Sequence, residues 1–256
     1  MIGEIPRVRV GGIPIVRMTG QELCTTMMAD VADARASRRS MPRLVTSANG
    51  MVIARYNRSA EFRGLVDAMD IVDADGMPLV LASRIFHRQP LTERVATTDW
   101  VLDACAAASA HGIKFYFLGA RPGVAARAAL HLGSRFPGLE IAGVHNGYFA
   151  DSDVDAICAR IVAAGTDVLW IGMGSPLQER FAVQAKALLP GVGWVRTCGG
   201  LFDHYGGGVS RAPRWMRTYG LEWLYRAARE PVRLGLRYAL TNPIALFDLA
   251  MRTRRD

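Results

Sequence analysis

The sequence has little cysteine and no long apolar run. Its four cysteines, at positions 24, 105, 158 and 198, stand far apart, and no two form a Cys-x-x-Cys pair. This pattern disfavours a disulfide framework and a structural zinc site, and a reducing cytoplasm fits best. No run of about 18 apolar residues occurs, and the N-terminus lacks the apolar segment of a signal peptide. The sequence therefore predicts neither a transmembrane helix nor a secretion signal.

Several catalytic signatures are also missing. The chain has no Gly-x-Ser-x-Gly nucleophile elbow and no P-loop, and its five histidines show no metal-ligand spacing. The stretch GMGSPL (172–177) lacks the third glycine of a dinucleotide fingerprint, and no acidic residue follows about twenty positions later. A nucleotide- or NAD-dependent Rossmann-like enzyme that uses this stretch as its phosphate loop stays open as an alternative.

Positive charge is concentrated at the C-terminus. The net charge is +8, and residues 211–256 hold ten arginines and four acidic residues, which leaves +2 for the preceding chain. Trp215, Tyr219 and Trp223 recur every four residues, as do Arg229, Arg233 and Arg237, so each set would share one face of a continuous helix. A basic, aromatic tail favours an anionic lipid surface, and no nucleic-acid-binding motif appears. A non-catalytic lipid-binding module is a further alternative.

Short apolar runs alternate with helical stretches over most of the chain. Residues 7–17 alternate around a Gly-Gly pair and predict a hairpin, and Thr19 and Glu22 form a capping box that opens a helix to about residue 37. Strands are predicted at 43–47, 70–75, 113–119, 139–144, 167–174 and 193–199, and helices at 59–69, 77–86, 98–111, 122–136, 152–164 and 176–189. The pattern predicts an α/β fold with a Rossmann-like, mainly parallel sheet covered by helices on both faces.

The strand pattern ends after Gly200. Residues 201–256 are interpreted as helical pieces punctuated by Pro213, Pro231 and Pro243. We therefore expect two parts. Residues 1–200 form a catalytic domain with an N-terminal hairpin and helix, and residues 201–256 form a basic, aromatic, membrane-associating appendage.

Ligands of parallel sheets bind beyond the carboxyl ends of the strands. The residues at these ends are Ser47, Asn49, Asp75, Gly76, Gly119, Gly174, Ser175, Gly199 and Gly200. Asp75 could act as a general base, could cap the following helix, or could bind a metal together with Asp73. The stretch GMGSPLQE (172–179) could hold a phosphate at a helix N-terminus, or Ser175, Pro176 and Gln178 could form a capping box.

Seven stretches together resemble the WecG/TagA/CpsF glycosyltransferases (glycosyltransferase family 26). They are TSAN (46–49), DADGMPLV (73–80), RVATTDW (94–100), HNGYF (145–149), GMGSPLQE (172–179), GGLFDHYGGGVSRAPRWM (199–216) and LEWLYRAAREPVRLGLRY (221–238). They follow the family's order over nearly the whole chain, and the last two together are the most specific.

This resemblance implies an inverting transfer of a sugar from a UDP-sugar to a sugar carried on polyprenyl diphosphate. Such acceptors lie at the cytoplasmic face of the inner membrane, where related enzymes build capsules, exopolysaccharides and wall polymers. The resemblance implies neither a metal ion nor a cofactor. It also suggests self-association, with the oligomeric state left open.

The resemblance also assigns roles to residues. It makes Asp75 the base. It places Ser47 and Asn49 at the family's T-x-N, Arg94 before its V-T-G-T-D and Gln178 in its P-K-Q-E. The predicted substrate site comprises Ser47, Asn49, Gly76, Arg94, Gly119, Gly174, Gln178, Glu179, Gly199, Gly200, Asp203, Arg226, Arg233 and Arg237.

Four positions depart from the family pattern. Ser47 replaces threonine, Thr97 replaces glycine, Leu177 replaces lysine, and Asp73 stands where the family commonly has an apolar residue. We therefore interpret Asp73 as a bystander and predict no metal at the Asp-x-Asp pair.

Overall fold

The N-terminal elements match their predicted form. The computed structural model describes residues 5–253, apart from the side chains of residues 218, 233 and 237. Strands β1 (Arg7–Val10) and β2 (Ile13–Val16) form an antiparallel hairpin whose turn glycines, Gly11 and Gly12, both have positive φ. Helix α1 (Gly20–Arg35) begins with the predicted capping box between Thr19 and Glu22.

Six parallel strands form the central sheet, in the order β4-β3-β8-β7-β5-β6. They are β3 (Arg43–Ala48), β4 (Ile71–Ala74), β5 (Lys114–Gly119), β6 (Glu140–His145), β7 (Val168–Gly172) and β8 (Trp194–Thr197). Each lies within one predicted apolar run, give or take a residue, and the predicted mixed α/β fold is confirmed. Because the strands are parallel, the residues after β3, β4, β7 and β8 meet at one edge of the sheet.

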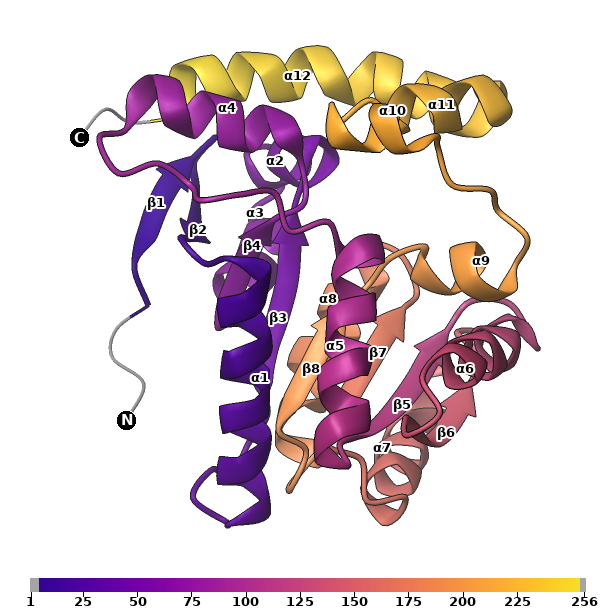
Figure 1. Cartoon of the computed structure of the whole chain (residues 1–256). Coiled ribbons are helices and arrows are strands. Elements are labelled where there is room, and N and C mark those ends of the chain that lie inside the picture. Colours follow the sequence, from indigo (N-terminus) through magenta and orange to yellow (C-terminus); the bar gives the residue numbers. More distant parts are fainter. Residues whose placement is uncertain (1–4, 254–256) are drawn as a thin grey trace.

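Helices cover both faces of the sheet (Figure 1). The core of one face contains side chains of α1, α5, α6 and α9, and that of the other contains side chains of α2, α3, α4, α7, α8 and the hairpin. Their bounds are α2 (Gly50–Tyr56), α3 (Ala60–Asp67), α4 (Met77–Phe86), α5 (Thr97–His111), α6 (Val124–Arg135), α7 (Val154–Ala163), α8 (Leu177–Ala185) and α9 (Leu201–Gly206), with short 3₁₀ turns η1 (Asp151–Asp153) and η2 (Lys186–Leu188).

Helix α2 was not predicted from the sequence. Asn49 caps this helix, and its Oδ1 accepts a hydrogen bond from Val52 N at 3.2 Å. An asparagine before a short helix is an ordinary N-cap signal. The helix is only two turns long, and its apolar residues Met51, Val52 and Ile53 are consecutive, so no helical period stood out.

Beyond α9 the tail is helical but broken. It consists of α10 (Arg214–Thr218), α11 (Glu222–Arg229), the π-helical turn η3 (Pro231–Gly235) and α12 (Leu236–Arg252). The chain leaves helical geometry at Glu230, where φ is −133° and ψ is 65°. Because α10, α11 and η3 are separate pieces, neither the four-residue aromatic repeat nor the four-residue arginine repeat lies on one continuous helix.

Prolines act differently along the tail. Pro213 is the N-cap of α10, and Pro231 is the first residue of η3, so both separate helical pieces as predicted. The prediction for Pro243 was wrong, because this residue lies inside α12. A helix continues through proline when neighbouring packing compensates for the lost hydrogen bond, and α12 packs along α2.

The tail is fixed to the rest of the molecule near both of its ends. Leu201 and Phe202 of α9 are buried in the core. At the other end, Gly12 N donates to Arg252 O at 3.1 Å, and Arg58 pairs with Asp248 at 2.6 Å. Helix α12 consequently lies beside α4 and α2 across the top of Figure 1. Within residues 5–253, no helix combines the length and apolarity that spanning a membrane requires.

Candidate active site

Asp75 follows β4 directly, at the carboxyl edge of the sheet. Its backbone N donates to Ala48 O at 2.9 Å, which fixes it beside the end of β3. Helix α4 begins with Gly76 as its N-cap and with no side-chain capping hydrogen bond. The Asp75 carboxyl is therefore not the helix cap that the sequence left open as an alternative.

Burial governs the proton affinity of Asp75. It raises the pKa of this carboxyl from an ordinary 3.8 to about 7. The positive charge of Arg94 opposes this effect, Asp73 and Glu222 add to it, and Arg196 also opposes it. A carboxyl with a pKa near 7 can both accept and release a proton close to neutral pH, which suits a general base.

Arg94 connects the surroundings of Asp75 to the tail. Its Nη1 donates to the backbone O of Arg217 at 2.8 Å, and its Nη2 lies 3.9 Å from Glu222 Oε2. Only 11% of the Arg94 side chain is exposed. The arginine that the sequence placed in the site is thus close to Asp75 and held by residues more than a hundred positions later.

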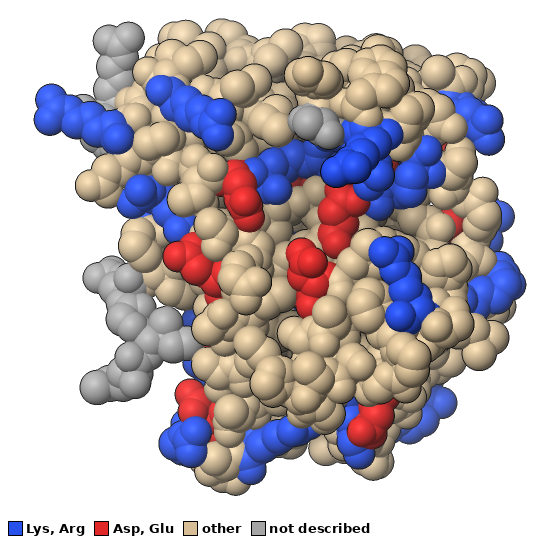
Figure 2. All heavy atoms as spheres, in the orientation of Figure 1, with Lys and Arg blue, Asp and Glu red and all other residues tan. Residues whose placement is uncertain are grey.

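A cluster of ion pairs, which we call the tail junction, holds the tail over this edge. It comprises Arg94, Asp99, Arg211, Arg217 and Glu222. Asp99 Oδ1 accepts from Arg217 Nη1 at 2.7 Å and from Arg211 Nη2 at 3.0 Å, and Arg211 Nε donates to Glu222 at 2.8 Å. Figure 2 shows basic and acidic side chains meeting across the middle of this face, below the tail.

Ser47 and Asp73 belong to a buried network beside Asp75. The Ser47 hydroxyl accepts from Arg196 Nη2 at 2.8 Å and lies 2.9 Å from Thr97 Oγ1. Arg196 is fully buried and forms an ion pair with Asp73, which is 1% exposed. Asp73 is therefore already occupied by a cation. Arg196 was not among the predicted site residues, although a charged residue inside an apolar strand signals a buried partner.

Gln178 joins α8 to the loop after β8. Its Oε1 accepts from Gly199 N at 3.0 Å, and its Nε2 donates to Glu179 Oε1 at 2.9 Å. Glu179 is buried, and burial raises its pKa while the hydrogen bond from Gln178 lowers it. The alternative capping box at Ser175 is not formed, because α8 begins at Leu177 after Pro176 with no side-chain cap.

Gly200, Asp203 and Arg226 come together beside this loop. A Cβ atom on Gly200 would lie 3.7 Å from Asp203 Oδ2 and 3.8 Å from Arg226 Nη2. Arg226 lies on α11, so the tail contributes a guanidinium group to the carboxyl edge of β8. The side chains of Arg233 and Arg237 lie outside the described residues.

The remaining predicted residues have mixed surroundings. Asn49 lies against Gly76, whose Cβ would be 3.6 Å from Asn49 Cα. Gly174 has φ +76° with open space around it, as a ligand-facing turn would have. Gly119 has φ +146°, and a Cβ there would lie 2.4 Å from Gly172 O. The need for glycine at position 119 is thus explained by the contact between β5 and β7.

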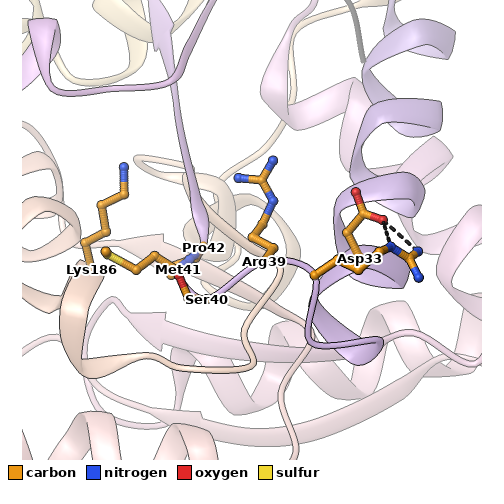
Figure 3. A pocket seen from close by; sticks show the side chains of 7 residues that line it. Asp33, Arg39, Ser40, Met41, Pro42 and Lys186 are labelled. Carbon is orange, nitrogen blue, oxygen red and sulfur yellow. Dashed lines mark hydrogen bonds and ion pairs between the residues drawn. The ribbon is translucent and has the colours of Figure 1, made fainter. Parts of the chain in front are cut away.

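Two hollows differ in their relation to these residues. One, of about 370 Å³, lies at the tail junction and is lined by Met77, Arg94, Ala96, Asp99, Arg217 and others. The other, of about 380 Å³, is lined by Arg38 and Arg39, which precede β3, and by Lys186 of η2, at the opposite end of the sheet (Figure 3). There Arg38 pairs with Asp33 and Arg39 with Asp30. The hollow at the tail junction, which we call the Arg94 cleft, is lined by one predicted site residue, Arg94. Neither Asp75 nor the predicted residues after β3 and β8 line it, so it adjoins the candidate site.

Among the residues that the structure describes, no group of three or more His, Cys, Asp or Glu side chains is arranged to hold a metal ion. The Asp-x-Asp pair offers one carboxylate to a ligand, because Arg196 occupies the other.

Comparison with known families covers nearly the whole chain. Residues 8–256 match the Glycosyl transferase WecG/TagA/CpsF family. The match includes the sheet, the carboxyl-edge residues and the tail. Its members are glycosyltransferases of cell-surface polysaccharide synthesis. The chain belongs to the WecG/TagA/CpsF family of glycosyltransferases.

Proposed function

We propose that the protein is an inverting, metal-independent glycosyltransferase that transfers a sugar from a UDP-sugar to a sugar linked to polyprenyl diphosphate, in exopolysaccharide or other cell-surface polysaccharide synthesis. The observation that carries this proposal is the Asp75 carboxyl. It stands at the carboxyl edge of a parallel sheet, beneath the tail, with a pKa of about 7. Family membership favours a transferase over the NAD-dependent and lipid-binding alternatives.

The proposed reaction is a single displacement. Asp75 takes the proton from an acceptor hydroxyl, whose oxygen forms a bond to the anomeric carbon of the donor sugar. The bond from that carbon to the UDP oxygen breaks on the opposite face, so the configuration inverts. The proton remains on Asp75 and the electron pair leaves with UDP.

Cations and backbone donors are proposed to stabilise the leaving diphosphate in place of a metal. The Gly199 N–H already donates to Gln178, so the backbone N–H of Gly200 is the proposed donor at this turn, and Arg226 lies beside Gly200. Arginine suits this task because its charge is permanent and its donors match two phosphate oxygens at once. Asn49, Gln178 and Asp203 are proposed to orient the nucleotide and sugar, Gln178 by holding Gly199.

A lipid-linked acceptor implies that the enzyme contacts a membrane, and the tail has an exposed apolar surface that suits this contact. On α12, Leu236, Leu240, Phe247 and Met251 lie on one helical face and are 60%, 68%, 57% and 69% exposed. Helix α4 lies next to α12 and exposes Leu81 and Ile85. The upper surface in Figure 2 is accordingly mostly uncharged. We propose that this surface lies against the cytoplasmic face of the inner membrane, as a peripheral contact.

Liposome binding tests the membrane surface. Leu236→Ser combined with Leu240→Ser should reduce binding to vesicles that contain anionic lipid. Leu130→Ser is the matched control, because Leu130 is 74% exposed on α6, away from α12. Unchanged binding by the double variant, or equal loss in the control, would count against this surface. Analytical ultracentrifugation of the wild type would report the self-association expected from the resemblance.

The function is tested by a donor screen followed by product analysis. Thermal shifts against UDP, a panel of UDP-sugars and NAD identify the ligand class, and the best donor is then supplied with a polyprenyl-diphosphate-linked sugar. The proposal expects stabilisation by UDP compounds, a product of inverted anomeric configuration by NMR, and turnover that a chelator leaves unchanged. Stabilisation by NAD alone, or a retained configuration, would overturn it.

A further inference from the structure

Three polar side chains from three different elements meet at one buried arginine. Ser47, Asp73 and Thr97 all contact Arg196, which lies on β8 and is fully buried. Ser47 and Asp73 are register partners on the neighbouring strands β3 and β4, and Thr97 begins α5. The Arg196 guanidinium also lies over the Trp100 ring, 5.1 Å from its centroid. These side chains therefore form one connected network.

We propose that Arg196, held by Asp73, is a positioning residue that fixes the Ser47 and Thr97 hydroxyls at the carboxyl edge and balances the charge environment of Asp75. This inference rests on the proposed role of Asp75 as the base. It also gives Asp73 a function, in place of its interpretation as a bystander.

Hydrogen-bond counting defines what the network can do. Arg196 Nη2 donates to Ser47 Oγ at 2.8 Å and to Thr97 Oγ1 at 3.0 Å, which uses both of its hydrogens. The two hydroxyls lie 2.9 Å apart, so one of them donates to the other. One hydroxyl hydrogen is left over, and Arg196, which cannot accept a hydrogen bond, cannot take it. Because Thr97 is buried and Ser47 is half-buried, Ser47 is the hydroxyl that offers this hydrogen to a substrate oxygen at the end of the sheet.

Charge balance is the second contribution. The groups that act on Asp75 are Arg94 before α5, Asp73 on β4, Arg196 on β8 and Glu222 on α11. Asp73 and Arg196 act in opposite directions, so their pairing cancels much of the influence of each. Removing only the Asp73 charge leaves an arginine that keeps its proton in any accessible pH range. The carboxyl of Asp75 then becomes a weaker base.

Substitution within the ion pair tests the charge balance in the full-length protein. The pKa of Asp75 is measured by NMR titration of ¹³C-labelled aspartate carboxyls, with the signal assigned by its loss in Asp75→Asn. Asp73→Asn should lower this pKa by about one unit, and adding Arg196→Met should raise it again. The low-pH limb of the pH profile of kcat/KM should move to lower pH in Asp73→Asn and back to higher pH in the double variant. An Asp75 pKa that does not move in Asp73→Asn would overturn this part of the proposal.

A second buried ion pair provides the control. Asp30 is fully buried and pairs with Arg43 at the opposite end of β3. Asp30→Asn should therefore cost comparable stability without moving the Asp75 titration. If Asp30→Asn shifted the Asp75 pKa as much as Asp73→Asn does, the shift would reflect general destabilisation, and the proposal would be overturned.

The hydroxyl contribution is tested without disturbing the ion pair. Thr97→Val and Ser47→Ala each remove one hydroxyl, and should lower kcat by about tenfold while leaving the Asp75 pKa in place. Unchanged kcat in both would overturn the positioning role, even if Asp73→Asn failed to fold. The NMR titration needs no substrate, so a chain that shows the shifts but transfers no sugar would count against the proposed function and not against the network.

Discussion

The Asp99 carboxylate on α5 and the Arg217 guanidinium on α10 are 2.7 Å apart, although 118 positions separate them in the chain. Arg211 donates to the same oxygen at 3.0 Å. One carboxylate at the start of a core helix therefore holds two arginines of the tail. This contact places the tail beside Arg94 and Asp75, and it makes the completeness of the site depend on how firmly the tail is docked.

Removing the Asp99 charge should loosen the tail. Asp99→Asn is expected to increase hydrogen exchange over residues 214–229 by roughly three- to tenfold, because two partly exposed charged contacts are weakened. The KM for the lipid-linked acceptor should rise as well. Glu61→Gln is the control, because Glu61 forms an exposed surface pair with Arg180 at 2.6 Å. Unchanged exchange in the tail of Asp99→Asn would contradict the role of the tail junction.

Gly220 should tolerate no side chain. Its φ is +71°, and a Cβ would lie 2.5 Å from Met77 Cβ, two residues after Asp75. Gly220→Ala is expected to push the tail away from α4, at a cost of about 1–3 kcal/mol, and to lower transfer activity. Gly235→Ala provides the comparison, because the nearest atoms there are 4.0 Å from the added Cβ. Equal activity of the two variants would argue against close packing of the tail over the site.

Gln178 should be needed to shape the loop after β8. Gln178→Leu leaves the Gly199 N–H and the buried Glu179 carboxyl without their partner, which should lower the free energy of unfolding by about 1–3 kcal/mol. UDP binding, measured by calorimetry, should weaken together with stability. Gln184→Leu replaces an exposed glutamine of the same helix and should change neither quantity. Normal UDP affinity in Gln178→Leu would show that this turn does not contact the donor.

Asp75 should make stability depend on pH. Its pKa is raised to about 7 in the folded state, so between about pH 4 and pH 7 the native protein keeps a proton that the unfolded chain releases. Stability should therefore fall as pH rises through this window. Asp75→Asn should unfold like the wild type near pH 4 and be more stable by up to about 4 kcal/mol at pH 8, as measured by urea denaturation. Asp151→Asn, at an exposed position, should follow the wild-type curve, and a wild-type-like curve for Asp75→Asn would contradict the raised pKa.

The sheet could be predicted because each strand is a short apolar run followed by turn residues. The same rule located the carboxyl edge and hence Asp75, Asn49 and Gly199. Helix α2 escaped because two turns carry little periodic signal. The inference from Pro243 failed because packing along α2 decided the outcome, and local propensity did not.

The electrostatic arrangement of the site could not be read from the sequence. Asp73 was noted in the sequence and Arg196 was not. The pairing of β3 with both β4 and β8, which brings the two together, is a property of the sheet order. The tail junction depends on the break between α10 and α11, which no proline marks, whereas Pro231 did mark the break before η3. The division of the chain at residue 200 remains a prediction, and α9 beyond it is buried against α6.

The pH dependence of sugar transfer, compared between wild type and Asp75→Asn, tests the central claim most directly. The wild type should show kcat/KM rising with pH through about 7, where Asp75 loses its proton. Asp75→Asn should fold, bind UDP normally, and transfer sugar about 10²- to 10⁴-fold more slowly, without that rise. Near-normal turnover by a folded Asp75→Asn, or an unchanged acid limb, would contradict the assignment of Asp75 as the base.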